Sequence, residues 1–287
     1  MMQDKKFPTG RALLVLTLFF FGGMMLTILA SSLLPHFGLG KLPVLRATII
    51  LQNLCTIIAP AVGVALIFGG GKPMTFLSAA KAPKLRDVCL MVLLYVCAIP
   101  AVNYLVTLNE AVVLPESMAA IEKALKESED AARQVTEQLL GDKSMPGFAV
   151  TIFAVAILTG IGEEFFFRGA LQGIFGKAIR NPHIVVWTVA FIFSAFHFQF
   201  YGLIPRTVLG AIFGYSVMWS RSLWVPILCH AVNNGTTAIW GETDASSIGG
   251  DISSPWLPIA SAVATIGIMI WWNRMAKREV REQRLEN

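Results

Sequence analysis

The sequence predicts an all-α protein, a polytopic transmembrane helical bundle of about eight spans. Of the 287 residues, 55% are hydrophobic and only 14% are charged, whereas a typical soluble domain has about 25% charged residues. The mean hydropathy is +0.64. Apolar runs of about 20 residues recur along the chain, and each is long enough to cross the hydrocarbon core as a helix. In lipid, helices satisfy their own backbone hydrogen bonds, so a helical bundle is favoured over a mixed fold.

The apolar runs define the expected spans. They lie near 12–34, 47–69, 88–107, 148–177, 184–201, 204–220, 223–240 and 256–272. The first run follows Lys5, Lys6 and Arg11, as the core of a signal peptide would. Its apolar stretch is longer than a typical signal core, and we therefore expect it to be a membrane span.

The distribution of polar residues divides the chain into four regions. We expect a three-span membrane scaffold over 1–107, an extracytoplasmic amphipathic segment over 108–146, a five-span catalytic core over 147–272 and a cytoplasmic mixed-charge tail over 273–287. The segment 108–146 has the composition of one or two amphipathic surface helices. It could be a lid or a partner-binding surface, and a simple connector is the expectation.

The basic residues predict the orientation. Most of the 23 Lys and Arg lie before the first span, in the loops after the second and fourth spans, and in the tail. Cytoplasmic segments carry such an excess, so both termini are expected in the cytoplasm of a multi-pass cell-membrane protein. The formal net charge of +5 then reflects topology, and no nucleic-acid partner is expected.

The four cysteines carry no recognisable chemistry. Cys55, Cys89, Cys97 and Cys229 all fall inside apolar runs, without CxxC or zinc-finger spacing. Such cysteines are expected to be buried and inert. The sequence also contains no glycine-rich phosphate loop, dinucleotide fingerprint, HExxH or GxSxG motif.

Three charges interrupt the fourth apolar run. Glu163, Glu164 and Arg168 lie in ILTGIGEEFFFRGALQGIF, although a charge at the bilayer centre costs roughly 2.5–3.5 kcal/mol on insertion scales. Glu164 and Arg168 are four residues apart on a helix, where they can form an ion pair. Glu163 is rotated by about 100°, so it requires a different partner or a function.

Candidate partners lie in two later spans. His197 follows Phe193 by one turn in FSAFHF, and His230 precedes Asn234 by one turn in HAVNN, with Asn233 beside it. Counted from the cytoplasmic ends of the spans, Glu163, His197, His230 and Asn234 lie at comparable depths. We therefore expect these side chains to meet inside the bundle.

The chemistry of this set favours hydrolysis of an amide bond. A carboxylate with an imidazole can activate water, and a second imidazole with an amide N–H can hold an oxyanion. Covalent catalysis is less favoured because Cys229 points away from His230. Alternatively, Glu163, His197 and His230 could form a His₂Glu site for a divalent metal such as zinc. The residues leave both mechanisms open, with a slight preference for metal-free water activation.

Two other functions are compatible with a polar cluster. A non-catalytic membrane interaction or immunity protein could retain it for packing. A transporter would spread polar groups along a path, whereas the first three spans contain almost no ionisable residue.

EEFFFR, FSAFH and HAVNN resemble the signature motifs of the CPBP family of intramembrane proteases. That family includes CAAX prenyl endopeptidases and bacterial proteins linked to bacteriocin processing and self-immunity. Its members are often described as metalloproteases, and a glutamate–histidine mechanism has also been argued. The resemblance implies a hydrolase with a cavity open to the cytoplasmic leaflet. For a compact chain of this kind, it implies leader peptides, signalling peptides or membrane proteins as substrates.

The resemblance also implies a role for each motif residue. Glu163 would activate water with help from His197, while Glu164 and Arg168 would orient the site. His230 and Asn234 would form the oxyanion pocket. Phe193 would pack beside the catalytic imidazole.

Overall fold

The computed structural model describes residues 7–142, 144–247 and 255–286. Every regular element in these ranges is helical, as predicted. Five helical segments are long and apolar enough to cross a membrane: Thr9–Phe37, Lys41–Phe68, Leu85–Glu110, Met145–Ala178 and Trp256–Leu285. They coincide with the first four and the last of the expected spans. The fold is therefore a polytopic helical membrane bundle.

The three remaining expected spans are the helices α10 (Pro182–Ala195), α11 (Leu203–Ser220) and α12 (Trp224–Ser247). α10 has 14 residues and is apolar but shorter than the other spans. At 1.5 Å per residue it is about 21 Å long, less than the hydrocarbon thickness of about 30 Å. The number of complete crossings therefore stays a prediction.

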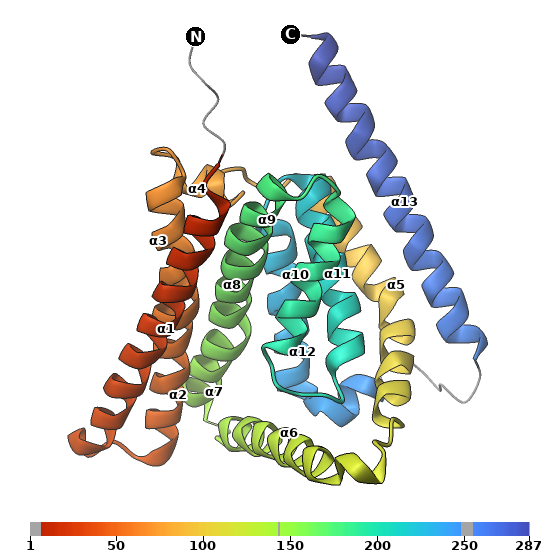
Figure 1. Ribbon diagram of the computed structural model, residues 1–287. Helices are drawn as coiled ribbons and strands as arrows, with labels where there is room; N and C mark the ends of the chain where they lie inside the picture. Colours follow the sequence, from red (N-terminus) through yellow and green to blue (C-terminus); the bar gives the residue numbers. More distant parts are fainter. Residues whose placement is uncertain (1–6, 143, 248–254, 287) are drawn as a thin grey trace.

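The bundle has a central span with helices on both sides (Figure 1). The central span is continuous and consists of α7 (Met145–Ile152), η4 (Phe153–Leu158), α8 (Thr159–Glu163), η5 (Glu164–Leu171) and α9 (Gln172–Ala178). On one side lie α1 (Thr9–Leu33), η1 (Leu34–Phe37), α2 (Lys41–Leu51), η2 (Gln52–Ile58), α3 (Ala59–Phe68) and the short α4 (Pro73–Phe76). On the other lie α10, α11, α12, α5 (Leu85–Glu110) and α13 (Trp256–Leu285).

The ends of α10 depart from the prediction in a way that matters for the site. Pro182 occupies the first turn, and the Asn181 side chain accepts a hydrogen bond from the His183 backbone N–H. The span expected over 184–201 is too long, because the helix ends at Ala195. Phe198 has φ +53°, a left-handed conformation that a helix cannot accommodate. His197 therefore lies in a turn after the helix.

Glycines set the contact between the central span and α11. Gly210 and Gly214 of α11 form a GxxxG pair, a spacing that is typical of close helix packing in membranes. An added Cβ at Gly210 would lie 3.1 Å from Arg168 Nη2, and one at Gly214 would lie 2.9 Å from Gln172 Oε1. The absence of side chains at these positions lets Arg168 and Gln172 approach the α11 backbone.

A separate helix crosses one end of the bundle. α6 (Ala119–Leu140) follows the short η3 (Glu116–Met118) and lies across the lower ends of the other helices in Figure 1. It is amphipathic, and Leu139 is its one buried residue.

Polar contacts fix the C-terminal end of α6 to the scaffold. Arg46 is 8% exposed. It pairs with Asp142 at 3.0 Å and donates to Thr151 Oγ1 at 3.0 Å, and Thr151 Oγ1 in turn donates to the Leu139 carbonyl. Hydrogen bonds from the Ser144 side chain and backbone, and from Arg46, hold the pKa of Asp142 below its usual range. The contact between Arg46 and Asp142 therefore requires the ionised carboxylate. It weakens when the pH falls through the lowered pKa of Asp142 and the carboxylate becomes protonated.

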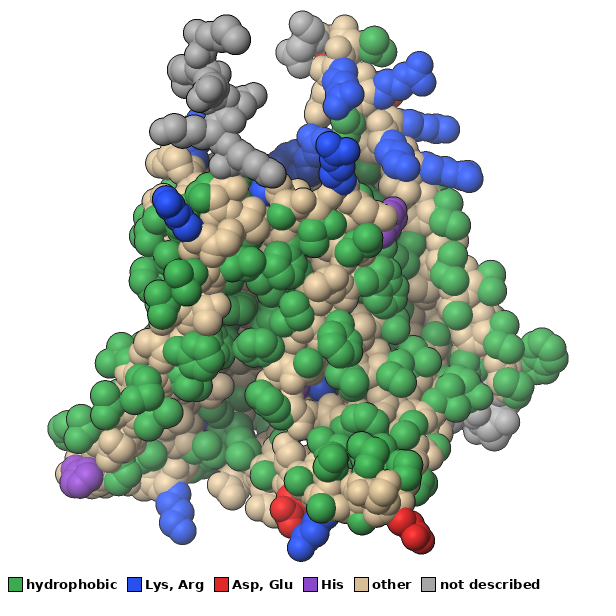
Figure 2. Space-filling model, in the orientation of Figure 1, with side chains coloured by type: hydrophobic (Ala, Val, Ile, Leu, Met, Phe, Trp, Pro, Cys, Tyr) green, Lys and Arg blue, Asp and Glu red, His purple; other side chains and the backbone are tan. Residues whose placement is uncertain are grey.

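The start of α1 and the end of α13 lie on the same side of the bundle, opposite α6 (Figure 1). Lys and Arg side chains gather on that side along the end of α13 (Figure 2). There Lys84 and Arg86 both pair with Glu279. The arrangement agrees with termini on one side, while the assignment of that side to the cytoplasm stays a prediction.

The cysteines are all free, and their burial differs from the expectation. Cys229 is buried, Cys55 and Cys97 are half-buried, and Cys89 is exposed on the surface of the bundle. An apolar run includes residues that face lipid as well as residues that face protein, so Cys89 is in a span without being in the core.

The orientation is testable by cysteine labelling. In a variant without native cysteines, we expect Lys123→Cys on α6 to react with a membrane-impermeant maleimide in intact cells. Arg281→Cys on α13 should react only after permeabilisation, because basic segments are retained in the cytoplasm. The opposite labelling pattern would show that α6 is cytoplasmic.

Candidate active site

The Glu164 carboxylate is the centre of the buried polar cluster. It lies on the π-helical segment η5 and is 0% exposed. Its Oε1 accepts hydrogen bonds from Arg168 Nη1 at 2.9 Å and from His230 Nδ1 at 2.8 Å. The expected pair with Arg168 thus forms, and the same carboxylate also links the central span to α12.

Arg168 connects this pair to α11. Its Nη2 donates to the Gly210 carbonyl at 3.0 Å, and one turn later Gln172 Nε2 donates to the Gly214 carbonyl at 3.1 Å. The guanidinium lies 4.3 Å from the centre of the Phe193 ring of α10. Arg168 is therefore held by α10, α11 and its own helix, and is 2% exposed.

Glu163 faces the two histidines predicted as its partners. His230 Nε2 is 3.4 Å from Oε2, and His197 Nε2 is 3.9 Å from Oε1. The side chain is 17% exposed, whereas that of Glu164 is 0% exposed. Adjacent carboxylates thus have different surroundings, one enclosed by protein and one at the surface of a cavity.

Hydrogen bonding defines the tautomer of each imidazole. His197 Nδ1 lies 2.9 Å from the Phe193 carbonyl, which can only accept, so Nδ1 carries a proton. His230 Nδ1 donates to Glu164 for the same reason. When the rings are neutral, the Nε2 lone pair of each is directed toward Glu163. A water bound beside these three groups would then meet only acceptors.

Phe193 packs beside the imidazoles, as the resemblance implied. Its ring centre is 5.0 Å from that of His197 in an edge-to-face arrangement and 6.0 Å from that of His230. Its backbone carbonyl also fixes His197. One residue at the end of α10 therefore orients the histidine of the following turn.

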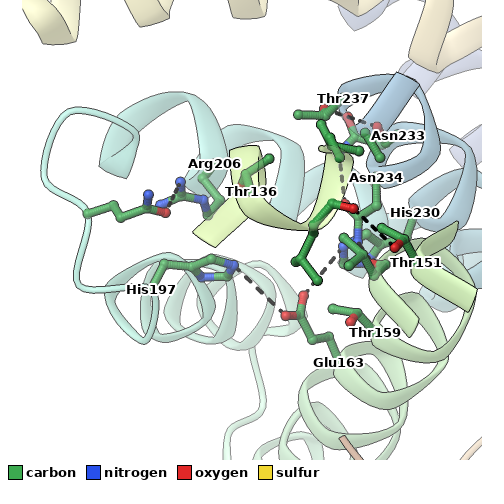
Figure 3. A pocket seen from close by; sticks show the side chains of 15 residues that line it. Thr136, Thr151, Thr159, Glu163, His197, Arg206, His230, Asn233, Asn234 and Thr237 are labelled. Atoms are coloured by element: carbon green, nitrogen blue, oxygen red, sulfur yellow. Dashed lines mark hydrogen bonds and ion pairs between the residues drawn. The ribbon is translucent and has the colours of Figure 1, made fainter. Parts of the chain in front are cut away.

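The site opens into a cavity of about 360 Å³. Figure 3 shows Glu163 between His197 and His230, with Thr136 of α6 across the cavity. The predicted residues that line it are Glu163, His197, His230 and Asn234, with Asn233 beside them. Glu164 and Arg168 lie behind this surface, in the protein interior. The remaining lining residues come from α6, α7, η4, α8, α11, α12 and the turn after α10: Thr136, Leu139, Leu140, Thr151, Val155, Thr159, Gln199, Arg206, Thr237 and Ala238.

A chain of hydrogen bonds sets the orientation of Asn234. The Tyr95 hydroxyl of α5 donates to Asn233 Oδ1 at 2.9 Å, and Asn233 Nδ2 donates to Asn234 Oδ1 at 3.3 Å. The carbonyl end of Asn234 is thereby occupied. Its NH₂ end makes one long contact of 3.4 Å with the Val155 carbonyl and retains a second N–H.

Sequence reasoning missed Tyr95, Gln199 and Arg206. Tyr95 lies in an expected scaffold span, where its hydroxyl in an otherwise apolar stretch was the available signal. Arg206 is an ionisable residue near the start of an apolar run, and this could have marked it. Nothing in the sequence distinguishes Gln199.

The predicted metal ligands do not form a recognisable metal site. Among the described residues, no group of three or more His, Cys, Asp and Glu has the arrangement of a metal site. Glu163, His197 and His230 converge, but as arranged here they do not form such a group. Metal use stays a prediction.

The cavity lies on the α6 side of the bundle, because Thr136, Leu139 and Leu140 of α6 line it. Figure 1 shows that α6 lies opposite the end of α13. With both termini in the cytoplasm, as the basic residues predict, the cavity faces the extracytoplasmic side. The resemblance instead implied a cavity open to the cytoplasmic leaflet. Because the cavity and the end of α13 lie on opposite sides, cytoplasmic termini and a cavity open to the cytoplasmic leaflet cannot both hold in this structure.

In comparisons with known proteins, one family model matches part of the chain. Residues 145–236 match the family model of type II CAAX prenyl endopeptidases, Rce1-like. The membrane-embedded CAAX protease MroQ of Staphylococcus aureus is 31% identical over 96 residues, which are 32% of this chain and 39% of MroQ.

Two Bacillus subtilis proteins of unassigned function also match. YpbD is 28% identical over 102 residues, covering 34% of this chain and 47% of YpbD. YyaK is 27% identical over 149 residues, covering 45% of this chain and 49% of YyaK. The chain thus matches less than half the length of each relative, and no solved structure gives a significant match. The matched segment 145–236 contains all three motifs.

Proposed function

We propose that this protein is an intramembrane endopeptidase that hydrolyses a peptide bond with water activated by Glu163. The observation that carries this proposal is the convergence of one cavity-facing carboxylate and two imidazole Nε2 atoms, at 3.4 and 3.9 Å. The match of residues 145–236 to the type II CAAX prenyl endopeptidase family model supports it.

In the proposed reaction, Glu163 accepts a proton from water, and the resulting hydroxide attacks the carbonyl carbon of the peptide. His197, with its free Nε2 lone pair, assists in holding the water. The C–N bond then breaks, and Glu163 returns its proton to the leaving amine. One water is consumed, and a carboxyl and an amino terminus are formed.

We assign the oxyanion pocket to Asn234 and His230. The free N–H of Asn234 is a donor in every protonation state of the site. His230 can donate through Nε2 only when both ring nitrogens carry protons, because Nδ1–H is already directed at Glu164. Asn234 is thus the more constant donor.

We infer that the substrate is a peptide or a membrane protein that reaches a lipid-embedded cavity. If the termini are cytoplasmic, the scissile bond is presented from the extracytoplasmic half of the membrane. Leader peptides, signalling peptides and the outer ends of membrane helices have this access.

Substitution of the base tests the activity. We expect purified Glu163→Gln to cleave a peptide library at least about 10²-fold more slowly than the unaltered protein, because a general base contributes about 10²–10⁴-fold. Parallel reactions with a chelator, followed by zinc addition, test the metal alternative. Retained turnover in Glu163→Gln would contradict the mechanism, and loss of turnover with chelator would assign Glu163 to a metal.

The two adjacent glutamates should differ in their effect on stability. Glu164→Ala leaves Arg168 and His230 buried without their carboxylate, and removing one partner of a buried pair costs about 3–5 kcal/mol. We expect a much lower unfolding temperature in detergent, measured by tryptophan fluorescence. Glu163→Ala should unfold close to the unaltered protein, and equal effects would refute this division of roles.

Tyr95 should affect the rate through Asn234. Tyr95→Phe removes one hydrogen bond, worth about 1 kcal/mol, and frees the Asn233 and Asn234 amides to rotate. We expect kcat to fall about five- to tenfold with KM unchanged. The control is Tyr104→Phe on the same helix, outside the cavity lining, and an equal loss there would exclude a specific role for Tyr95.

A further inference from the structure

The helix α6 contributes to the site in two ways. Its C-terminal half covers the cavity, since Thr136, Leu139 and Leu140 line it. Its middle contacts the turn after α10, which carries His197. Both contributions come from a helix outside the matched family segment.

The contacts with the turn are specific. Glu129 Oε1 accepts from the Tyr201 backbone N–H at 3.1 Å, and Oε2 accepts from Gln199 Nε2 at 3.2 Å. The neighbouring Ser128 hydroxyl donates to the Phe198 carbonyl at 3.0 Å. Two consecutive residues of α6 thus bind three of the four residues that follow His197.

The turn depends on such external contacts. Phe198 has a left-handed backbone, with φ +53°. This conformation is unfavourable for a residue with a bulky side chain. The far end of the turn is fixed from α5, where the Asn109 side chain binds the Phe200 carbonyl and the Ile204 N–H. Ser128 binds Phe198, the residue next to His197, and Glu129 binds Gln199 and Tyr201 on either side of Phe200.

α6 has little buried surface. Leu139 is its one buried residue among 22, whereas all eight residues of η5 are buried. Segments with little buried apolar surface open at a lower free energy than the core. A peptide must reach Glu163 through a cavity that α6 covers, so movement of α6 is the simplest route of entry.

We propose that α6 is a lid whose closure positions His197, with Glu129 and Ser128 as positioning residues. When α6 lies over the cavity, Glu129 holds the turn, and Nε2 of His197 faces Glu163. When α6 moves away to admit a peptide, the turn loses these contacts. The site is then complete only with the lid closed. The role of the lid rests on the proposed protease function, while the hold on the turn does not.

Hydrogen exchange tests the positioning claim without requiring activity. In Glu129→Ala we expect the amides of 197–203 to exchange about tenfold faster, since charged hydrogen bonds are lost. The matched control is Glu127→Ala on the same helix, whose side chain is 67% exposed and 3.8 Å from Lys123. Glu129→Gln keeps an acceptor for the Tyr201 N–H, so the amides of 197–203 should exchange at an intermediate rate. This variant replaces Glu129→Ala in the test if Glu129→Ala does not fold. Exchange equal to that of Glu127→Ala would overturn the claim.

Exchange and kinetics together test the lid. In the unaltered protein we expect the backbone amides of α6 to exchange faster than those of the central span. Equal exchange rates in the two elements would refute the lid. Glu129→Ala should lower kcat about tenfold with KM unchanged, whereas Glu127→Ala should leave both unchanged. Faster amide exchange of the turn with an unchanged kcat would overturn the claim that Glu129 positions His197 for catalysis. Absence of any proteolysis in the unaltered protein would refute the protease function, and the exchange result would still decide whether Glu129 holds the turn.

Discussion

The rest of the site depends on the buried Glu164 carboxylate. One oxygen atom accepts from Arg168 and from His230, and so joins the central span to α12, while Arg168 continues the connection to α11. A buried charge is tolerated only when it is paired and hydrogen-bonded. This requirement fixes the relative positions of three helices and determines which nitrogen of His230 faces the cavity.

The adjacent glutamates show how neighbouring residues of one type acquire different roles. A helix turns by about 100° per residue, so Glu163 and Glu164 point in different directions. Glu164 is enclosed by arginine, imidazole and apolar side chains, and it acts as a structural anion. Glu163 faces a cavity with two imidazole lone pairs, and it has the surroundings of a general base. The pairing of Glu164 with Arg168 leaves Glu163 free to face the histidines.

The matched segment contains Glu163, His197, His230 and Asn234, and elements outside it complete their surroundings. Tyr95 of α5 reaches Asn234 through Asn233, Asn109 of α5 holds the turn after α10, and α6 covers the cavity. Arg46 and Asp142 attach the C-terminal end of α6 to the scaffold. The scaffold and the connecting segment are therefore parts of the site, although their sequences contain none of the three motifs.

The sequence by itself determined the helical membrane class and the Glu164–Arg168 pair, because hydropathy and the spacing of residues along one helix are local properties. The comparable depths of Glu163, His197 and His230 in their apolar runs predicted that they meet, and the tertiary structure supplied the geometry of that meeting. Only the tertiary structure decided where α10 ends, because that depends on the left-handed backbone of Phe198 and on its contacts with α6. It also decided that Tyr95 orients Asn234 and that the cavity lies beneath α6. These features arise from contacts between residues far apart in the chain, and no local pattern encodes such contacts.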